Sequence, residues 1–308
     1  MVKIISPEVY TTNQQLQDAQ GPAAPPAPWF VRHAYSVLVL LLLCLLLIAV
    51  YHTVLGKLFS DWQSQDNSHG FLVPFFAAFL VWEKRSTLRA VKIAPAWSGI
   101  PVMLFGLIVL LLGVYGSELF LSRISMLLVA AGLVLCLGGA QLLKELRFAL
   151  LVLLLAIPLP AIIYNQITFP LQILASKLAS NLLPLFGVPV LREGNIIELP
   201  AMKLEVAEAC SGIRSLMSLF TLAVFYGYFM ERSNARRIIL VLASIPIAIA
   251  ANAVRILGTG LCVQYWDPDK ALGFFHEFSG WVIFLVSLVC LFVVHRAMSL
   301  IPFRRQRP

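Results

Sequence analysis

Long apolar runs are the feature of this sequence that most limits what it can fold into. One of them, YSVLVLLLLCLLLIAVY, begins at Tyr35 and carries no charged residue. About 20 such residues are enough for a helix to cross the hydrocarbon core of a bilayer, which is roughly 30 Å thick. Over the whole chain 60% of the residues are hydrophobic and 12% are charged, which is far from the composition of soluble domains. The sequence therefore predicts an all-α polytopic membrane protein.

The apolar runs predict about eight transmembrane helices, of which the second is the shortest. They cover roughly residues 34–55, 70–83, 98–116, 120–140, 148–166, 211–230, 238–262 and 279–297. The first run follows a polar tail, is long, and has no convincing cleavage site. We therefore interpret it as a retained anchor rather than a signal peptide.

The basic residues predict the orientation of these helices. With the N-terminus inside, most of the 23 lysines and arginines fall in cytoplasmic segments, as the positive-inside bias requires. The loop ERSNARR and the tail PFRRQRP then act as topology signals, so the net charge of +8 does not indicate nucleic-acid binding. Both termini are expected in the cytoplasm.

The division of the chain follows from the same pattern. Residues 1–33 form a cytoplasmic tail that contains GPAAPPAP and is expected to be disordered. Residues 34–297 form the membrane-embedded domain, and residues 298–308 form a basic cytoplasmic tail.

One external segment, residues 167–210, is long enough to form a small extracytoplasmic cap. It opens with ITFPLQILASKLASNLLPLFG, in which polar residues are interspersed among apolar ones, as in an amphipathic surface helix or a re-entrant piece. The stretch PVLREGNIIEL then predicts a short β-hairpin with EGN as its turn. The cap leads directly into a cysteine.

That cysteine, Cys210 in EACSGIRS, stands where an apolar helix is expected to begin. The unpaired N–H groups and the dipole of a helix N-terminus favour an anion and lower the pKa of a thiol. Arg214, four residues later, would add positive charge on the same face. A small residue that allows close packing of helices explains these local features equally well. The five cysteines show no metal-type spacing, so no metal or other cofactor is expected.

Depth along the helices brings Cys210 together with two other residues. At about 1.5 Å per residue, Cys210, Arg255 and His276 lie roughly 33, 27 and 30 Å from the basic residues that end their helices in the cytoplasm. Three segments thus carry a thiol, a guanidinium and an imidazole to the same outer layer. This set suits a thiolate nucleophile, a proton shuttle and a donor to an oxyanion.

Each of the last two residues also has an alternative interpretation. Arg255 lies inside a span, which is costly unless it faces a polar interior or extends to the outer head groups. Asn252, one turn earlier, indicates a polar face that could hold the guanidinium. His276 follows several aromatic residues and would also fit as an interfacial anchor.

The motifs EACSGIRS, NAVRI and HEFSGW, in this order on consecutive helices, resemble the exosortase/archaeosortase family of membrane transpeptidase-like enzymes. WQSQDNSHGFLVP at 62–74 resembles an early motif of the same family, and the resemblance covers roughly residues 35–297. It implies that Cys210, Arg255 and His276 form the catalytic set.

The resemblance also implies substrates and a location. The substrates are exported proteins that end in a short motif such as Pro-Glu-Pro, a transmembrane helix and a basic tail. The enzyme would cut near the motif through a Cys thioester, at the periplasmic face of a bacterial inner membrane. The acceptor, an amine or a lipid, is not specified by the sequence, and membrane lipids are the remaining partners.

Five further polar residues are expected to bind substrate or support this set. Asp66 and His69 lie at the outer end of the second span, where His69 competes with His276 as the general base. Arg214 would tune the thiolate or bind an acidic substrate residue. The other two are Asn252 and Glu208, of which Glu208 would either orient His276 or have no partner.

Two other classes of function remain open from the sequence. A transporter or lipid-linked saccharide carrier would use Arg255 and His276 to bind an anionic head group, with Cys210 incidental. The chain shows no matched halves of the kind that many transporters have. The other class is a non-catalytic assembly scaffold.

Overall fold

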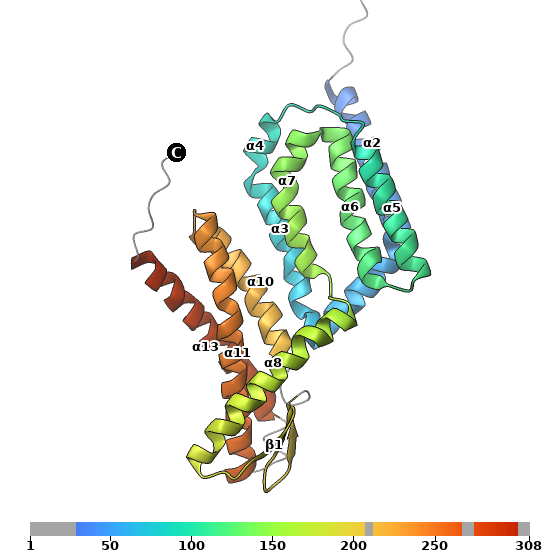
Figure 1. Ribbon diagram of the computed structural model, residues 1–308. Helices are drawn as coiled ribbons and strands as arrows, with labels where there is room; N and C mark the ends of the chain where they lie inside the picture. Colours follow the sequence, from blue (N-terminus) through green and yellow to red (C-terminus); the bar gives the residue numbers. More distant parts are fainter. Residues whose placement is uncertain (1–28, 207–211, 267–273, 301–308) are drawn as a thin grey trace, which may run out of the picture. The chain divides into compact units, whose positions relative to one another are not determined.

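The computed structural model describes residues 29–206, 212–266 and 274–300, and these residues are predominantly helical (Figure 1). The chain divides into two units, residues 1–53 and 54–308, with the boundary inside helix α2. The helices before the sheet are α2 (Trp29–Gln63), α3 (Leu72–Glu83), α4 (Arg85–Ala90), α5 (Gly99–Tyr115), α6 (Leu119–Gly138), α7 (Ala140–Leu153) and α8 (Ala161–Leu182). Those after it are α10 (Gly212–Met230), α11 (Asn234–Tyr265) and α13 (Phe274–Leu300). The described residues also contain three short 3-10 helices: η1 (Gln65–Phe71), η2 (Leu154–Ala156) and η3 (Leu183–Phe186).

Four stretches of the described residues are long and apolar enough to cross a membrane. They are Val37–Gln63, Leu119–Gly138, Asn234–Tyr265 and Phe278–Leu300. A fifth is present if α7 and α8, with the 3-10 turns that follow each of them, count as one broken span. The chain is therefore a helical membrane protein. The expected number of eight spans stays a prediction, since α3 has only 12 residues and α5 only 17.

The predicted span at 148–166 is wrong as a continuous helix. The segments Ala140–Ala156 and Ala161–Phe186 are separate and differ in direction by 74°. The break contains Pro158 and Pro160, and proline both lacks an N–H donor and disfavours the helical conformation of the residue before it. A helix covers the segment expected from residue 167, but it begins earlier, at Ala161, and its place on the membrane surface stays a prediction.

The predicted hairpin is present within a three-stranded antiparallel sheet. Strands β1 (Leu191–Glu193) and β2 (Ile196–Glu198) pair, and β3 (Lys203–Glu205) pairs with β2. Gly194 in the turn has φ of 63°, a conformation that glycine adopts without steric cost. The inward side chains of the sheet join a core that includes Ala175 of α8 and Ile256 of α11. The sheet thus supports the part of α11 that carries Arg255, while the extracytoplasmic position of the cap remains a prediction.

Helices α10, α11 and α13 lie side by side (Figure 1) and pack through a shared apolar core. Leu219 of α10, Leu240 of α11 and Leu291 of α13 are all buried in it. On its other side α10 contacts α3, where Phe76 and Phe225 stack with ring centroids 3.7 Å apart. The 3-10 helix η1, which precedes α3, contacts α10 and η2. These contacts bring η1 next to the start of α10.

Candidate active site

A cavity of about 460 Å³ lies where η1, α10, α11 and α13 meet. Its described lining is polar on the η1 and α10 side and partly aromatic on the α13 side. The lining residues are Gln63, Gln65, Ser68, Arg214, Ser215, Ser218, Arg255, Gly280, Trp281 and Phe284. Two arginines and no carboxylate are among these described residues, so the local charge favours an anionic or carbonyl-rich ligand.

Arg255 of α11 is buried, with 5% of its surface exposed. A Cβ added to Gly280 of α13 would lie 3.4 Å from its Nη2, an ordinary contact distance, so the guanidinium lies beside Gly280. The side chain therefore faces the interior of the protein. This orientation fits the expectation that a charge inside a span faces a polar interior.

Arg214 lies in the first turn of α10 and is joined to η1 by an ion pair. Its Nε lies 3.2 Å from Oδ1 of Asp66, and both side chains remain partly exposed. Arg214 lines the cavity, whereas Asp66 binds Arg214 and is not among the described lining residues. The structure thus brings together three of the predicted residues, Arg214, Arg255 and Asp66, around one cavity.

His69 is half-buried in η1 and does not line this cavity, although its neighbour Ser68 does. Burial lowers the pKa of His69 below its ordinary value of 6.5, and the backbone carbonyls of Leu155 and Asp66 partly oppose this effect. A ring held neutral in this way can accept a proton, but among the described residues it does not border the cavity.

Asn252 is buried on α11 but does not line the large cavity. It borders a separate cavity of about 20 Å³, next to Thr168 and Gln172 of α8. The expectation that Asn252 holds the guanidinium therefore has no support among the described contacts. Three polar and four apolar side chains line this space, which is about the size of one water molecule.

Two predicted residues, Cys210 and Glu208, lie outside the described residues. In sequence, Cys210 stands two residues before the described start of α10 at Gly212. His276 belongs to α13, one turn before Gly280, and its side chain also lies outside the described part. Within the described ranges no three His, Cys, Asp or Glu side chains gather as metal ligands do.

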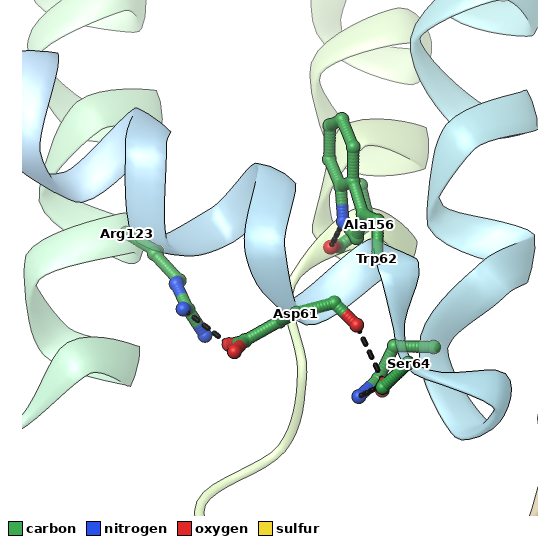
Figure 2. A network of polar contacts seen from close by, with 6 residues as sticks. Asp61, Trp62, Ser64, Arg123 and Ala156 are labelled. Carbon is green, nitrogen blue, oxygen red and sulfur yellow. Dashed lines mark hydrogen bonds and ion pairs between the residues drawn. The ribbon is translucent and has the colours of Figure 1, made fainter.

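The structure also identifies a polar network that the sequence did not predict (Figure 2). Asp61, near the end of α2, accepts a hydrogen bond from Nη2 of Arg123 at 2.5 Å, and the Arg123 side chain is only 3% exposed. Next to Asp61, Nε1 of Trp62 donates to the carbonyl of Ala156 at 2.7 Å. A Cβ on Gly70 would lie 2.3 Å from Cδ1 of Trp62. This network fixes η1 against the break between α7 and α8.

Several of these residues had weak signals in the sequence. Asp61 and Arg123 each lie beside the outer end of a predicted span, but nothing in the sequence pairs two charges 62 positions apart. Trp62 and Gly70 belong to the early motif WQSQDNSHGF. That motif drew attention to Asp66 and His69, and nothing in it indicated that Trp62 and Gly70 contact each other.

Fold and cavity together define a polytopic helical membrane protein with an arginine-lined polar site among its helices. The model of the transmembrane exosortase family (Exosortase_EpsH) matches residues 62–293, which is more than half of the chain. The chain therefore belongs to the transmembrane exosortase family. The match begins at Trp62, the first residue of the early motif, and ends within α13, so it leaves out most of the first apolar helix. No curated protein and no solved structure shows a significant match to the chain.

Proposed function

We propose that this protein is a cysteine protease or transpeptidase that cleaves the C-terminal sorting segment of exported proteins. The segment would carry a motif of the Pro-Glu-Pro type, followed by a transmembrane helix and a basic tail. Cleavage would occur at the periplasmic face of the bacterial inner membrane, with both termini of the enzyme in the cytoplasm.

One observation carries this proposal. The buried guanidinium of Arg255 lies against Gly280 at a cavity that Arg214 also lines. Arg214 follows Cys210 by four residues, and His276 precedes Gly280 by four residues on the same helix. Arg255 itself lines this cavity, and each of the other two proposed catalytic residues stands four positions along the chain from a residue that lines it.

The chemistry assigned to these residues is acyl transfer through a thioester. The thiolate of Cys210 attacks the carbonyl carbon of the scissile peptide, and Arg255 donates hydrogen bonds to the oxyanion that forms. The C–N bond then breaks, and His276 gives a proton to the leaving amine. Water or an acceptor amine attacks the thioester and gives up a proton to the now neutral His276, and Cys210 leaves as a thiolate, which restores the starting state.

The shape of the substrate fits this location. A substrate helix with its basic tail in the cytoplasm would place its motif near the outer end of the helix. The proposed catalytic residues are expected at the same depth, about 27–33 Å from the cytoplasmic ends of their helices. Membrane insertion itself would then align the scissile bond with Cys210.

Co-expression with an exported protein that carries such a sorting segment tests the proposal. Cys210→Ala should abolish processing at unchanged enzyme level, and Cys210→Ser should fail too, since an unactivated hydroxyl is a much poorer nucleophile than a thiolate. Cys262→Ala, on α11, is the matched control and should process normally. The mass of the new C-terminus separates hydrolysis from transfer. Full processing by Cys210→Ala would exclude the assigned nucleophile.

A further inference from the structure

Arg214 has an arrangement that the proposed catalytic set does not explain. Its side chain lines the cavity, and its Nε is held by Oδ1 of Asp66 at 3.2 Å. Within the described ranges, Asp66 is the single hydrogen-bond or ion-pair partner of Arg214. A guanidinium has five N–H donors in a rigid fork, so this contact leaves the four N–H donors of the two Nη groups for a ligand.

The segment that carries Asp66 is anchored by Trp62. Trp62 anchors η1 to the carbonyl of Ala156 at 2.7 Å, and its indole packs so closely on Gly70 that no side chain fits there. An arginine side chain loses about 2 kcal/mol of rotamer freedom when it is fixed. A carboxylate carried by an anchored segment offsets part of that loss before the substrate arrives.

We propose that Asp66 is a positioning residue that holds Arg214 so that its two Nη groups form a subsite for an anionic group of the substrate. That the bound anion belongs to a substrate rests on the proposed function. The choice of an anion follows from the described lining, which contains Arg214 and Arg255 but no carboxylate. A carboxylate matches the paired Nη groups because two parallel N–H···O bonds can form.

A charged thiol reagent measures this subsite without relying on catalysis. Ser218, one turn after Arg214 on α10, lines the same cavity. In a full-length chain with all five native cysteines replaced, Ser218→Cys provides a single reporter thiol. We would compare its reaction rates with 2-sulfonatoethyl methanethiosulfonate, which is anionic, and methyl methanethiosulfonate, which is neutral. Both reagents react with the same thiolate, so a change in the ionisation of the reporter thiol alters both rates equally and leaves their ratio unchanged.

Positioning and simple charge predict opposite results for Asp66→Asn. Removing the carboxylate makes the cavity more positive, so charge alone would raise the ratio of anionic to neutral rates. If Asp66 positions Arg214, the ratio should instead fall at least about threefold, and Arg214→Gln should lower it about tenfold, as expected for loss of a charge-assisted hydrogen bond. Glu145→Gln is the matched control and should not change the ratio. It breaks the 2.9 Å ion pair with Lys84, at the opposite end of α3 from η1.

A raised or unchanged ratio in Asp66→Asn would overturn the proposal. If the cysteine-free chain does not fold, processing of the co-expressed substrate by the native-cysteine enzyme gives a second measurement. Asp66→Asn should then raise KM at least about threefold, with a smaller effect on kcat, and Asp66→Glu should restore part of the loss. An unchanged KM in Asp66→Asn would likewise reject the positioning role. Full processing by Cys210→Ala would reject the proposed function. The ratio of reporter rates would still show whether Asp66 positions Arg214 in the cavity.

Discussion

Nε1 of Trp62 donates a hydrogen bond to the carbonyl of Ala156 at 2.7 Å, which joins the end of α2 to the break between α7 and α8. The contact connects residues 94 positions apart. It supports η1, the segment that presents Asp66 to Arg214 and Ser68 to the cavity. The first member of the early motif thus acts in the structure as the support of a neighbouring polar segment.

Enlarging Gly70 should therefore disturb η1. In Gly70→Ala the new Cβ would lie 2.3 Å from Cδ1 of Trp62, and overpacking of this kind costs about 1–3 kcal/mol. Thermal unfolding in detergent should show a lower midpoint for the variant. Gly258→Ala on α11 is the control, because nothing lies within 4 Å of the added Cβ. An unchanged midpoint in Gly70→Ala would mean that the indole moves away freely.

The pair of Asp61 and Arg123 predicts a non-additive result. Asp61→Ala should destabilise the protein by about 3 kcal/mol, since it leaves the nearly buried guanidinium of Arg123 without its carboxylate. The double variant Asp61→Ala/Arg123→Met should be less destabilised, because it also removes the buried charge. Chemical unfolding of the two single variants and the double variant gives the coupling. Additive losses would show that the pair is not coupled.

The lowered pKa of His69 predicts a specific dependence on pH. Burial keeps the ring neutral in the folded protein, whereas in the unfolded chain it binds a proton near its ordinary value of 6.5. The unfolded state therefore takes up more protons as the pH falls below about 6.5, so stability is lost in that direction. His69→Gln should show a flatter loss between pH 7.5 and 5.5 than the native protein, measured by thermal unfolding.

A histidine on the exposed surface gives the control for that measurement. His52 lies exposed on α2, and His52→Gln should leave the difference between the two pH values unchanged. If His69→Gln lost as much stability as the native protein over this range, His69 would not be the group responsible.

Much of the fold follows from local pattern, and the exceptions have physical causes. The apolar runs predicted most of the helices, and EGN predicted the turn at Gly194. Both signals are local, because the spacing of apolar residues and the preferences of turn residues act over a few positions. The break at Pro158 and Pro160 had a local signal too, but the apolar run around it suggested one span. The number of membrane spans depends on such breaks and cannot be counted from hydropathy alone.

The candidate site was predictable in part for a different reason. Arg255 was singled out because a charge inside an apolar run is costly, and it lies at the cavity. Asn252, three residues before it, borders a different cavity, since helical neighbours three apart can still face different partners. The partner of Arg214 came only from packing, because Asp66 lies 148 positions away in the chain. Sequence spacing carries no information about such pairs.

Gly280 gives the sharpest test of the arrangement around Arg255. A Cβ there would meet Nη2 of Arg255 at 3.4 Å, an ordinary contact, so Gly280→Ala should retain most processing activity. Gly280→Val adds two methyl groups that would push the guanidinium aside. A displacement of about 1 Å at a catalytic group can cost about a hundredfold in rate, so we expect processing of the co-expressed substrate to fall to that extent at unchanged enzyme level. Equal activity of the two variants would show that Arg255 does not need its place beside Gly280.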